Sequence, residues 1–242
     1  MLVNSRAGHT VFNQHHTFIM VSIILCTYNR ATLLPRAITS VVRQTISEWE
    51  LIIIDDGSRD ATYRVAKQFF DTDQRIVYFY QSNCGLAQAR NRGLQLATGN
   101  FVCFVDSDDE LAPTHLEQRV KYLQRRPSVD FLHGGTKLIG PKEKQYVVDL
   151  TNPKKKIHLS KCHVGGTFFF RKEVLKKVPG FRAIPFGEDF DFYTRVKERF
   201  TVKKVNFPTY LYHLDVEDRL CDVYTKQLMK KDVKVGQQLA TQ

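Results

Sequence analysis

Three carboxylates follow a short apolar run in Phe104-Val-Asp-Ser-Asp-Asp109, and they form the strongest chemical signal in the sequence. In an extended chain alternate residues face the same side, so Asp106 and Asp108 are expected to point together. Two convergent carboxylates repel each other and favour a bound cation. Their hard oxygen atoms suit Mg²⁺ or Mn²⁺, which would then bridge substrate phosphates. The alternative is a solvated acidic turn that caps the next helix.

A second acidic group, Asp55-Asp56-Gly57-Ser58, follows the apolar run Leu51–Ile54. An Asp at this place can accept a hydrogen bond from a ring N–H of a pyrimidine base. The alternative is a helix N-cap in which Gly57 supplies the turn and Ser58 or Asp60 supplies the cap. Taken alone, this segment favours the cap.

A third acidic pair, Glu188-Asp189, follows Phe186-Gly187 and precedes an apolar-rich segment typical of a helix. A carboxylate at a helix start can take the proton of an attacking hydroxyl group, as a general base does. Acidic residues also stabilise a helix N-terminus without any chemistry. The other two acidic groups favour the general base.

The elements that must position these groups alternate between strands and helices. Apolar runs predict buried strands over 21–26, 51–54, 76–80 and 101–105. Helical spacing of apolar residues predicts helices over 33–42, 61–70 and 87–97. This alternation predicts an α/β fold with a Rossmann-like, doubly wound, mostly parallel sheet. Such sheets bind ligands beyond the carboxyl ends of their strands, where the first two acidic groups stand.

The pattern loosens beyond Pro113, which predicts a smaller, mixed acceptor-side region. We expect helices over 114–125 and 188–200, strands near 129–133, 167–170, 202–206 and 210–213, and a hairpin or loop over 142–161. The predicted organisation is a polar extension over 1–17, one domain over 18–215 and a charged tail over 216–242. Within the domain, residues 18–110 form the nucleotide-binding half and residues 111–215 the acceptor-side half.

The composition limits the classes of partner. The 242 residues carry 36 Lys and Arg against 25 Asp and Glu, a net charge of +11 that favours anionic partners. No nucleic-acid-binding motif accompanies this charge, so nucleic acid is not expected. The five cysteines are odd in number and lack a CxxC pair, and no apolar run reaches the roughly 18–20 residues that span a bilayer. We therefore expect a cytoplasmic protein, with peripheral attachment to an anionic membrane as a further expectation.

Five segments occur in an order that resembles the family 2 glycosyltransferases of the GT-A fold. They are 22–29 (SIILCTYN), 55–58 (DDGS), 85–91 (GLAQARN), 106–109 (DSDD) and 187–191 (GEDFD). The likeness runs from about Val21 to His213, although family members often have Pro where Cys26 stands. It implies a nucleotide-sugar donor, usually linked to UDP, a divalent metal held by the DxD motif, and inversion at the anomeric carbon.

The resemblance also implies roles for individual residues. The donor-binding positions are Thr27, Tyr28, Asp55, Asp56, Arg90 and Asp106. The metal positions are Asp108, with Asp106 and Asp109 beside it, and His213 near the diphosphate. Asp189 matches the catalytic base, with Glu188 next to it.

The expected reaction moves a hexosyl or N-acetylhexosaminyl group from the donor to a hydroxyl of a glycan, lipid-linked or protein acceptor. The nearest rival, a nucleotidyltransferase, would need a Gly-rich phosphate loop with a Lys after the first strand, where Thr27-Tyr28-Asn29 stands. A second rival is a non-catalytic module that binds nucleotide sugars or glycans, in which the metal-binding and catalytic carboxylates would not be needed. Asp106, Asp108 and Asp189 are all present.

Overall fold

A computed structural model of the chain describes residues 19–149, 152–216 and 219–223. The predicted extension over 1–17 and nearly all of the predicted tail over 216–242 lie outside the described residues. In the described ranges no helix combines the length and apolar character needed to cross a membrane.

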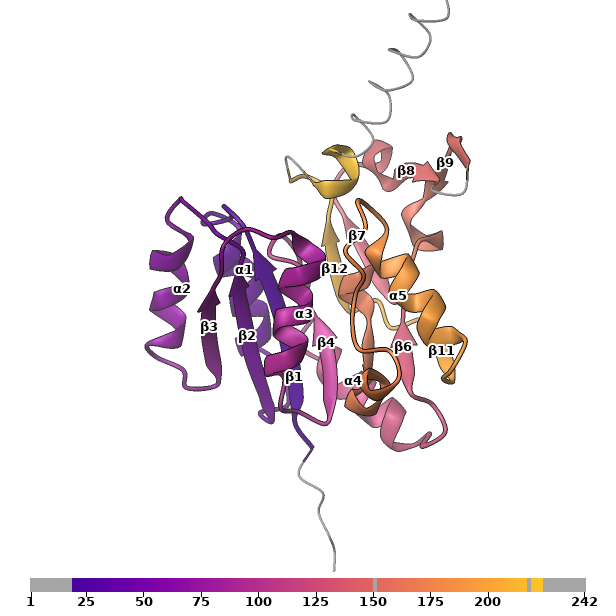
Figure 1. The fold of residues 1–242 in the computed structure, drawn as a ribbon, viewed down its shortest axis with the longest axis horizontal. Helices are drawn as coiled ribbons and strands as arrows, with labels where there is room; N and C mark the ends of the chain where they lie inside the picture. The colour runs from indigo at the N-terminus through magenta and orange to yellow at the C-terminus, as the bar shows by residue number, and fades with distance from the viewer. Residues whose placement is uncertain (1–18, 150–151, 217–218, 224–242) are drawn as a thin grey trace, which may run out of the picture.

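The core is a seven-stranded sheet in the order β11-β6-β10-β4-β1-β2-β3 (Figure 1). Its strands are β1 (Val21–Thr27), β2 (Trp49–Asp55), β3 (Ile76–Tyr80), β4 (Phe101–Phe104), β6 (Phe131–His133), β10 (Phe169–Arg171) and β11 (Val202–Lys204). All neighbouring pairs are parallel except those that β10 makes with β4 and β6. The predicted mostly parallel sheet is therefore confirmed.

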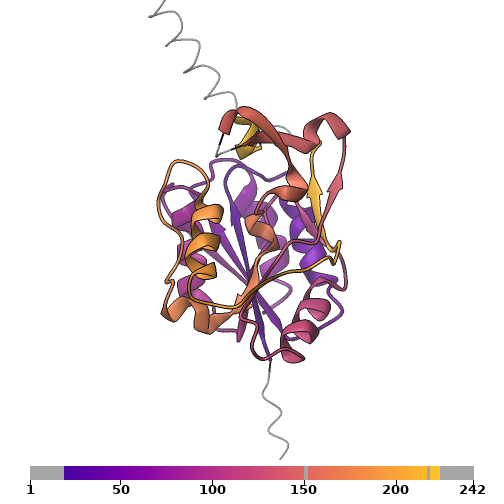
Figure 2. The ribbon, with the colours of Figure 1, turned by 90° about the vertical axis from the view of Figure 1, so that its right-hand side faces the viewer.

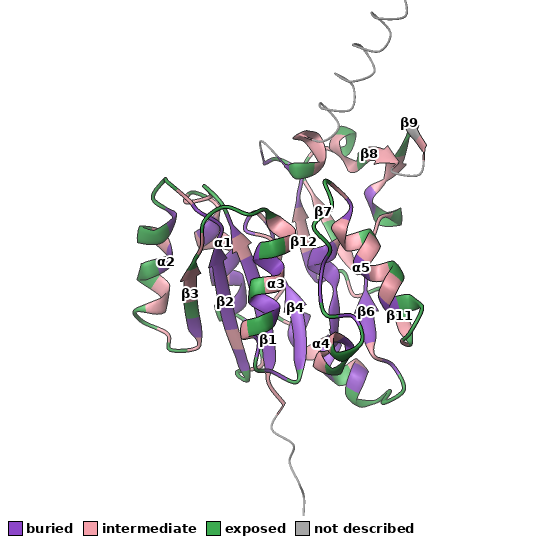
Figure 3. Ribbon diagram, in the orientation of Figure 1, coloured by how far each residue is buried: buried purple, intermediate pink, exposed green. Residues whose placement is uncertain are grey.

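Helices cover both faces of this sheet, as a doubly wound fold requires. The helices are α1 (Leu34–Val42), α2 (Thr62–Phe70), α3 (Leu86–Leu96), α4 (His115–Gln124) and α5 (Glu188–Lys197). Apolar residues of α1, α2 and α4 pack on one face, and those of α3 and α5 pack on the other. The central strands β1, β2 and β4 are almost wholly buried, which explains their continuous apolar runs, whereas the edge strands β3 and β11 are partly exposed (Figure 3).

The acceptor-side half adds a small mixed sheet and a hairpin. The sheet has the order β5-β12-β7, from Glu110–Leu111, Tyr210–His213 and Thr136–Ile139. The antiparallel strands β8 (Tyr146–Asp149) and β9 (Asn152–His158) form the hairpin, which confirms one of the two forms predicted for 142–161. Four 3₁₀ turns complete this half: η1 (Lys142–Gln145), η2 (Leu159–Lys161), η3 (Gly165–Thr167) and η4 (Lys172–Lys176). The hairpin lies at the end of the molecule where the strands β1, β2 and β4 finish (Figures 1 and 2).

Candidate active site

The loops that follow β1 and β2 are joined by hydrogen bonds at the carboxyl edge of the sheet. The Asn29 backbone N–H donates to the Ser58 hydroxyl at 2.8 Å, and the Asn29 side-chain oxygen accepts from the Arg59 backbone N–H at 2.8 Å. Asn29 has a φ of 51°, a left-handed conformation that Asn tolerates better than most residues. The two loops therefore form one fixed wall of the site.

Both acidic side chains after β2 are buried and engaged in internal hydrogen bonds. Asp55 accepts from the Ser58 backbone N–H and from the Tyr78 hydroxyl, so each of its oxygens has a partner. Asp56 accepts from the side chain of Gln81 and from the backbone N–H groups of Cys84 and Gly85, at 2.7, 3.0 and 2.8 Å. In the structure the two carboxylates shape the turn after β2 and the loop that enters α3, while at the start of α2 the Thr62 N–H donates to the Asp60 carboxylate at 2.9 Å.

Thr27 and Tyr28, at the end of β1, differ in what they offer a ligand. The Thr27 side chain is 3% exposed, and its hydroxyl has no hydrogen-bond partner among the described residues. An unpaired buried hydroxyl costs free energy that a bound polar group would recover. The ring of Tyr28 is 47% exposed and is open to stacking.

Arg90 joins the two halves of the domain. Its guanidinium group is buried and contacts Asp106 at 3.2 Å and Glu188 at 3.0 Å. It also lies over the rings of Phe104 and Phe181, 5.7 and 5.3 Å from their centroids. Burial lowers the pKa of Arg90, but the adjacent carboxylates outweigh it, and the net pKa lies above its ordinary value. The charge is therefore held permanently between α3, the segment after β4 and the start of α5.

The segment after β4 corrects one step of the prediction. β4 ends at Phe104, and Ser107-Asp108 form a turn in which the Asp109 N–H donates to the Asp106 carbonyl at 3.0 Å. The expected extended chain is wrong, because the strand ends two residues earlier than the motif. The carboxylates are still close: burial and the charge of Asp106 raise the pKa of Asp108, while Arg30 and Arg36 oppose the rise.

The predicted metal positions separate into two groups. Asp109 is 2% exposed, and its oxygens accept from the Tyr210 hydroxyl and the His213 backbone N–H, both at 2.8 Å. The His213 ring lies 2.8 Å from Glu110 and 3.6 Å from Asp215. Over the described ranges, no three His, Cys, Asp or Glu side chains are arranged to hold a metal ion together. The four-residue metal set is thus not assembled, since Asp109 and His213 belong to an internal network.

Tyr210 is a site residue that the sequence did not reveal. It is fully buried on β12, and its hydroxyl lies 2.8 Å from Asp109 and 3.2 Å from Asp106. A Cβ at Gly166 would stand 2.1 Å from that hydroxyl, so the close approach requires glycine there. Gly166 lies in η3, whereas Tyr210 lies on β12. Because β12, which carries Tyr210, is far from Gly166 in the sequence, no local sequence pattern indicates that the two residues meet.

Asp189 lies in the first turn of α5, as predicted for the base. Its carboxylate accepts from the Gly165 N–H at 3.1 Å and from the Phe190 N–H at 2.7 Å. Burial and then the neighbouring Glu188 raise the pKa of Asp189 to about 6, against the opposing effect of Arg90. A carboxylate with this pKa is ionised at neutral pH and is a stronger base than an ordinary Asp.

Because its pKa is raised in the folded state, Asp189 should make the free energy of unfolding depend on pH. The folded state binds this proton more tightly than the unfolded state, so the contribution is fully present below about pH 4 and is lost as the pH rises through about 6. Urea denaturation of the wild type should therefore give a free energy of unfolding that falls more steeply between pH 4.5 and 7 than that of Asp189→Asn. Parallel curves would contradict the assignment.

The sequence of the chain is similar to those of known glycosyltransferases. The profile of Glycosyl transferase family 2 matches residues 22–179, well over half of the chain. Glycosyltransferase GlyA of Streptococcus pneumoniae is 39% identical over 101 residues, which are 42% of this chain and 14% of that protein. The putative teichuronic acid biosynthesis glycosyltransferase TuaG of Bacillus subtilis is 37% identical over 108 residues, 44% of this chain and 43% of that protein.

Solved structures share the fold over a longer part of the chain. TarS 1-349 of S. aureus in complex with UDP-GlcNAc superposes with a TM-score of 0.69 at 22% identity, over 83% of this chain and 60% of that one. The mannosyltransferase PcManGT of Pyrobaculum calidifontis, with GDP-Man and Mn²⁺, gives 0.66 at 21% identity, over 84% and 59%. The chain thus spans less than two thirds of each of these four proteins. The fold is that of the GT-A glycosyltransferases, and with the profile match the chain belongs to glycosyl transferase family 2.

Proposed function

We propose that the protein transfers a hexosyl or N-acetylhexosaminyl group from a nucleotide-diphosphate sugar, UDP-linked in the first instance, to an acceptor hydroxyl with inversion. The observation that carries this proposal is the Arg90 bridge. It holds Asp106 of the nucleotide-binding half and Glu188 of the acceptor-side half on one guanidinium group. A donor-side carboxylate and the candidate base Asp189 are thereby kept at a single edge of the sheet.

The nucleoside would bind where β1 and β2 end. The unpaired hydroxyl of Thr27 supplies a buried hydrogen-bond group, and the exposed ring of Tyr28 supplies a stacking surface. The Oδ1 atom of Asp56 accepts from Gln81 and from the N–H and thiol of Cys84, whereas Oδ2 accepts from the Gly85 N–H alone and is the oxygen that could also accept from a ring N–H. Asp55 would hold the loop after β2 in position, since its carboxylate accepts hydrogen bonds from the Ser58 N–H and the Tyr78 hydroxyl.

The acceptor hydroxyl would lose its proton to Asp189. Its raised pKa increases the driving force for proton transfer, and the hydrogen bonds from the Gly165 and Phe190 amides fix its orientation. Glu188 cannot easily share this task because Arg90 holds it as an ion pair. With a single base on the face opposite the leaving group, the acceptor oxygen gives its proton to Asp189 and attacks the anomeric carbon as the bond to the diphosphate oxygen breaks, and this direct displacement inverts the configuration.

The charge of the diphosphate leaving group calls for a divalent cation, Mn²⁺ or Mg²⁺. Asp108 and Asp106 fit this need by their chemistry and place, because both are carboxylates in the short segment that follows β4, on either side of Ser107. No other described residue donates a hydrogen bond to the Asp108 carboxylate, which leaves its oxygens open. Mg²⁺ is commonly held by one or two protein carboxylates together with substrate phosphates, and when bound it stabilises the departing diphosphate as a Lewis acid. PcManGT was solved with Mn²⁺.

A titration of UDP with and without Mn²⁺ tests the proposal. We expect the wild type to bind UDP in a metal-dependent way and Asp108→Asn to lose that dependence while keeping its melting temperature, because the long-range hydrogen bond of Asp108, from the Arg36 side chain, goes to its backbone carbonyl and not to its carboxylate. Asp191→Asn, which removes a carboxylate outside the donor edge, is the control. A panel of nucleotide sugars ranked by the rise in melting temperature then identifies the donor. Failure of every nucleotide to bind with either metal would reject the proposed function.

A further inference from the structure

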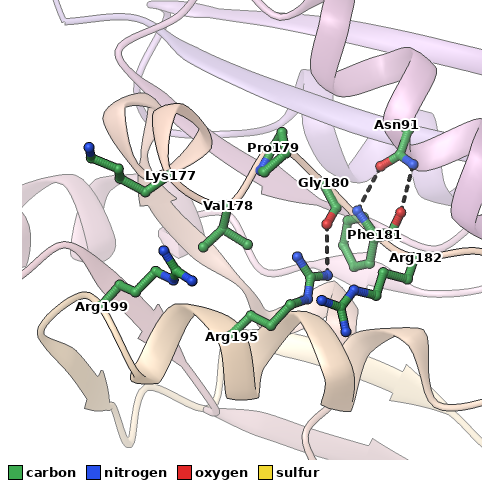
Figure 4. A pocket seen from close by; sticks show the side chains of 9 residues that line it. All are labelled: Asn91, Lys177, Val178, Pro179, Gly180, Phe181, Arg182, Arg195 and Arg199. Carbon is green, nitrogen blue, oxygen red and sulfur yellow. Dashed lines mark hydrogen bonds between the residues drawn. The ribbon is translucent and has the colours of Figure 1, made fainter.

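A basic cavity of about 350 Å³ lies between α3, α5 and the loop 177–182, outside the donor edge (Figure 4). Four cationic residues line it: Lys177, Arg182, Arg195 and Arg199. Arg195 stands six residues after Asp189 on α5, about 9 Å further along the helix axis. The cavity is therefore separate from the groups to which the proposed transfer assigns a role.

The wall of this cavity is held in place by Asn91. Its side-chain amide donates to the Phe181 carbonyl at 2.8 Å and accepts from the Phe181 N–H at 2.7 Å. A Cβ at Gly180 would stand 2.3 Å from the Asn91 side-chain oxygen, so glycine is required there. Arg195 donates to the Gly180 carbonyl at 2.8 Å, which ties α5 to the same loop. The cavity is thus preformed by the fold.

Positive charge in the cavity exceeds the negative charge that could balance it. Asp191 is shared by Arg182 at 3.2 Å and Arg195 at 2.7 Å. No described acidic side chain pairs with Lys177 or Arg199. Arg195 and Arg199 are four residues apart, a spacing at which like charges repel on a helix surface. An anion in the cavity would relieve this repulsion.

We propose that this cavity is a binding site for a phosphate group carried by a small ligand or a lipid headgroup. In Figure 4 the guanidinium groups of Arg182, Arg195 and Arg199 lie along one side of the cavity and face the loop. The planar guanidinium fork matches two oxygens of a phosphate, and its charge strengthens both hydrogen bonds. A volume of about 350 Å³ accommodates a phosphate together with a glycerol-sized or sugar-sized group.

The test is a titration with glycerol phosphate, by calorimetry, of the wild type and two double variants of the full chain. Lys177→Gln with Arg199→Gln removes the two cations that have no acidic partner, so folding should be unaffected. Arg64→Gln with Arg125→Gln removes the same charge from exposed positions on α2 and after α4. We expect the affinity to fall about tenfold or more in the cavity variant and less than about twofold in the control.

Two further arms identify the source of the phosphate and separate this proposal from the transfer reaction. Co-sedimentation with phosphatidylglycerol vesicles that weakens only in the cavity variant assigns a lipid headgroup, and binding of soluble glycerol phosphate alone assigns a soluble ligand. Metal-dependent UDP binding should be equal in all three proteins, because the donor edge is untouched. Equal affinity of wild type and cavity variant for glycerol phosphate, with no difference on vesicles, would overturn the proposal.

Discussion

Asp189→Asn is expected to lower the turnover of sugar transfer by about 10²–10⁴-fold, the usual contribution of general-base catalysis. The amide keeps the shape of the side chain but cannot accept a proton. Affinity for the donor should stay within about twofold, because the residues around β1, β2 and β4 are unchanged. Steady-state kinetics on the wild type and the variant, with a calorimetric donor titration, measure both quantities.

The pH profile and a neighbouring variant sharpen this test. Because the pKa of Asp189 lies at about 6, wild-type turnover should fall as the pH drops through that value, when the carboxylate gains its proton. Glu188→Gln should retain more activity than Asp189→Asn, since the Glu188 carboxylate is engaged in an ion pair with Arg90. Near-normal turnover in Asp189→Asn would move the base to another carboxylate of the first turn of α5.

Arg90→Met is expected to be the most destabilising single substitution in the site, by about 3 kcal/mol or more. It leaves the partly buried carboxylates of Asp106 and Glu188 without their shared cation. Arg90→Lys should recover only part of the loss, because one ammonium group does not reproduce the fork that reaches both carboxylates. Urea denaturation at pH 7 measures the free energy of unfolding of each variant.

A double-mutant cycle separates this effect from the loss of packing on Phe104 and Phe181. The double variant Arg90→Met with Glu188→Gln should lose less free energy of unfolding than the sum of the losses in the two single variants. The reason is that Glu188→Gln removes a carboxylate charge that Arg90→Met alone leaves unpaired. Arg64→Met, an exposed position on α2, should change stability by less than about 0.5 kcal/mol. Strict additivity, or a loss in Arg90→Met no greater than in Arg64→Met, would mean that the bridge contributes nothing.

The sequence predicted the nucleotide-binding half nearly element by element, because each buried parallel strand shows as a continuous apolar run between helices. The run of apolar residues over 51–54, for example, lies inside β2 (Trp49–Asp55). In the acceptor-side half the strands have only two to seven residues and pair across long stretches of sequence. Their presence was partly predictable, but their partners were not.

The candidate site shows the same division. Motif order identified the acidic residues, since each follows a recognisable strand or precedes a helix. The partners of those residues come from elsewhere: Tyr210 reaches Asp106 from β12, and the Gly165 amide reaches Asp189 from η3. The role expected for Asp109 rested on its proximity to Asp108 in the sequence, and the role expected for His213 rested on the family resemblance. Tertiary contacts instead engage the Asp109 carboxylate with Tyr210 and the His213 backbone, and the His213 ring with Glu110.

The reversed direction of β10 has a consequence for how such a domain can diversify. Phe169 pairs with Cys103 and Arg171 with Phe101, so β10 starts at the end of the sheet where β4 finishes. The chain leaves β6 after His133 at that end and returns there at Gly165, where the Gly134 N–H donates to Thr167 and the Gly165 N–H donates to Asp189. The intervening segment is thus an insertion whose two ends lie near Asp189. Lengthening or exchanging this insertion would reshape the acceptor side while the donor-binding strands keep their register. Chimaeras that swap only residues 140–162 between relatives should therefore exchange acceptor preference and retain the donor.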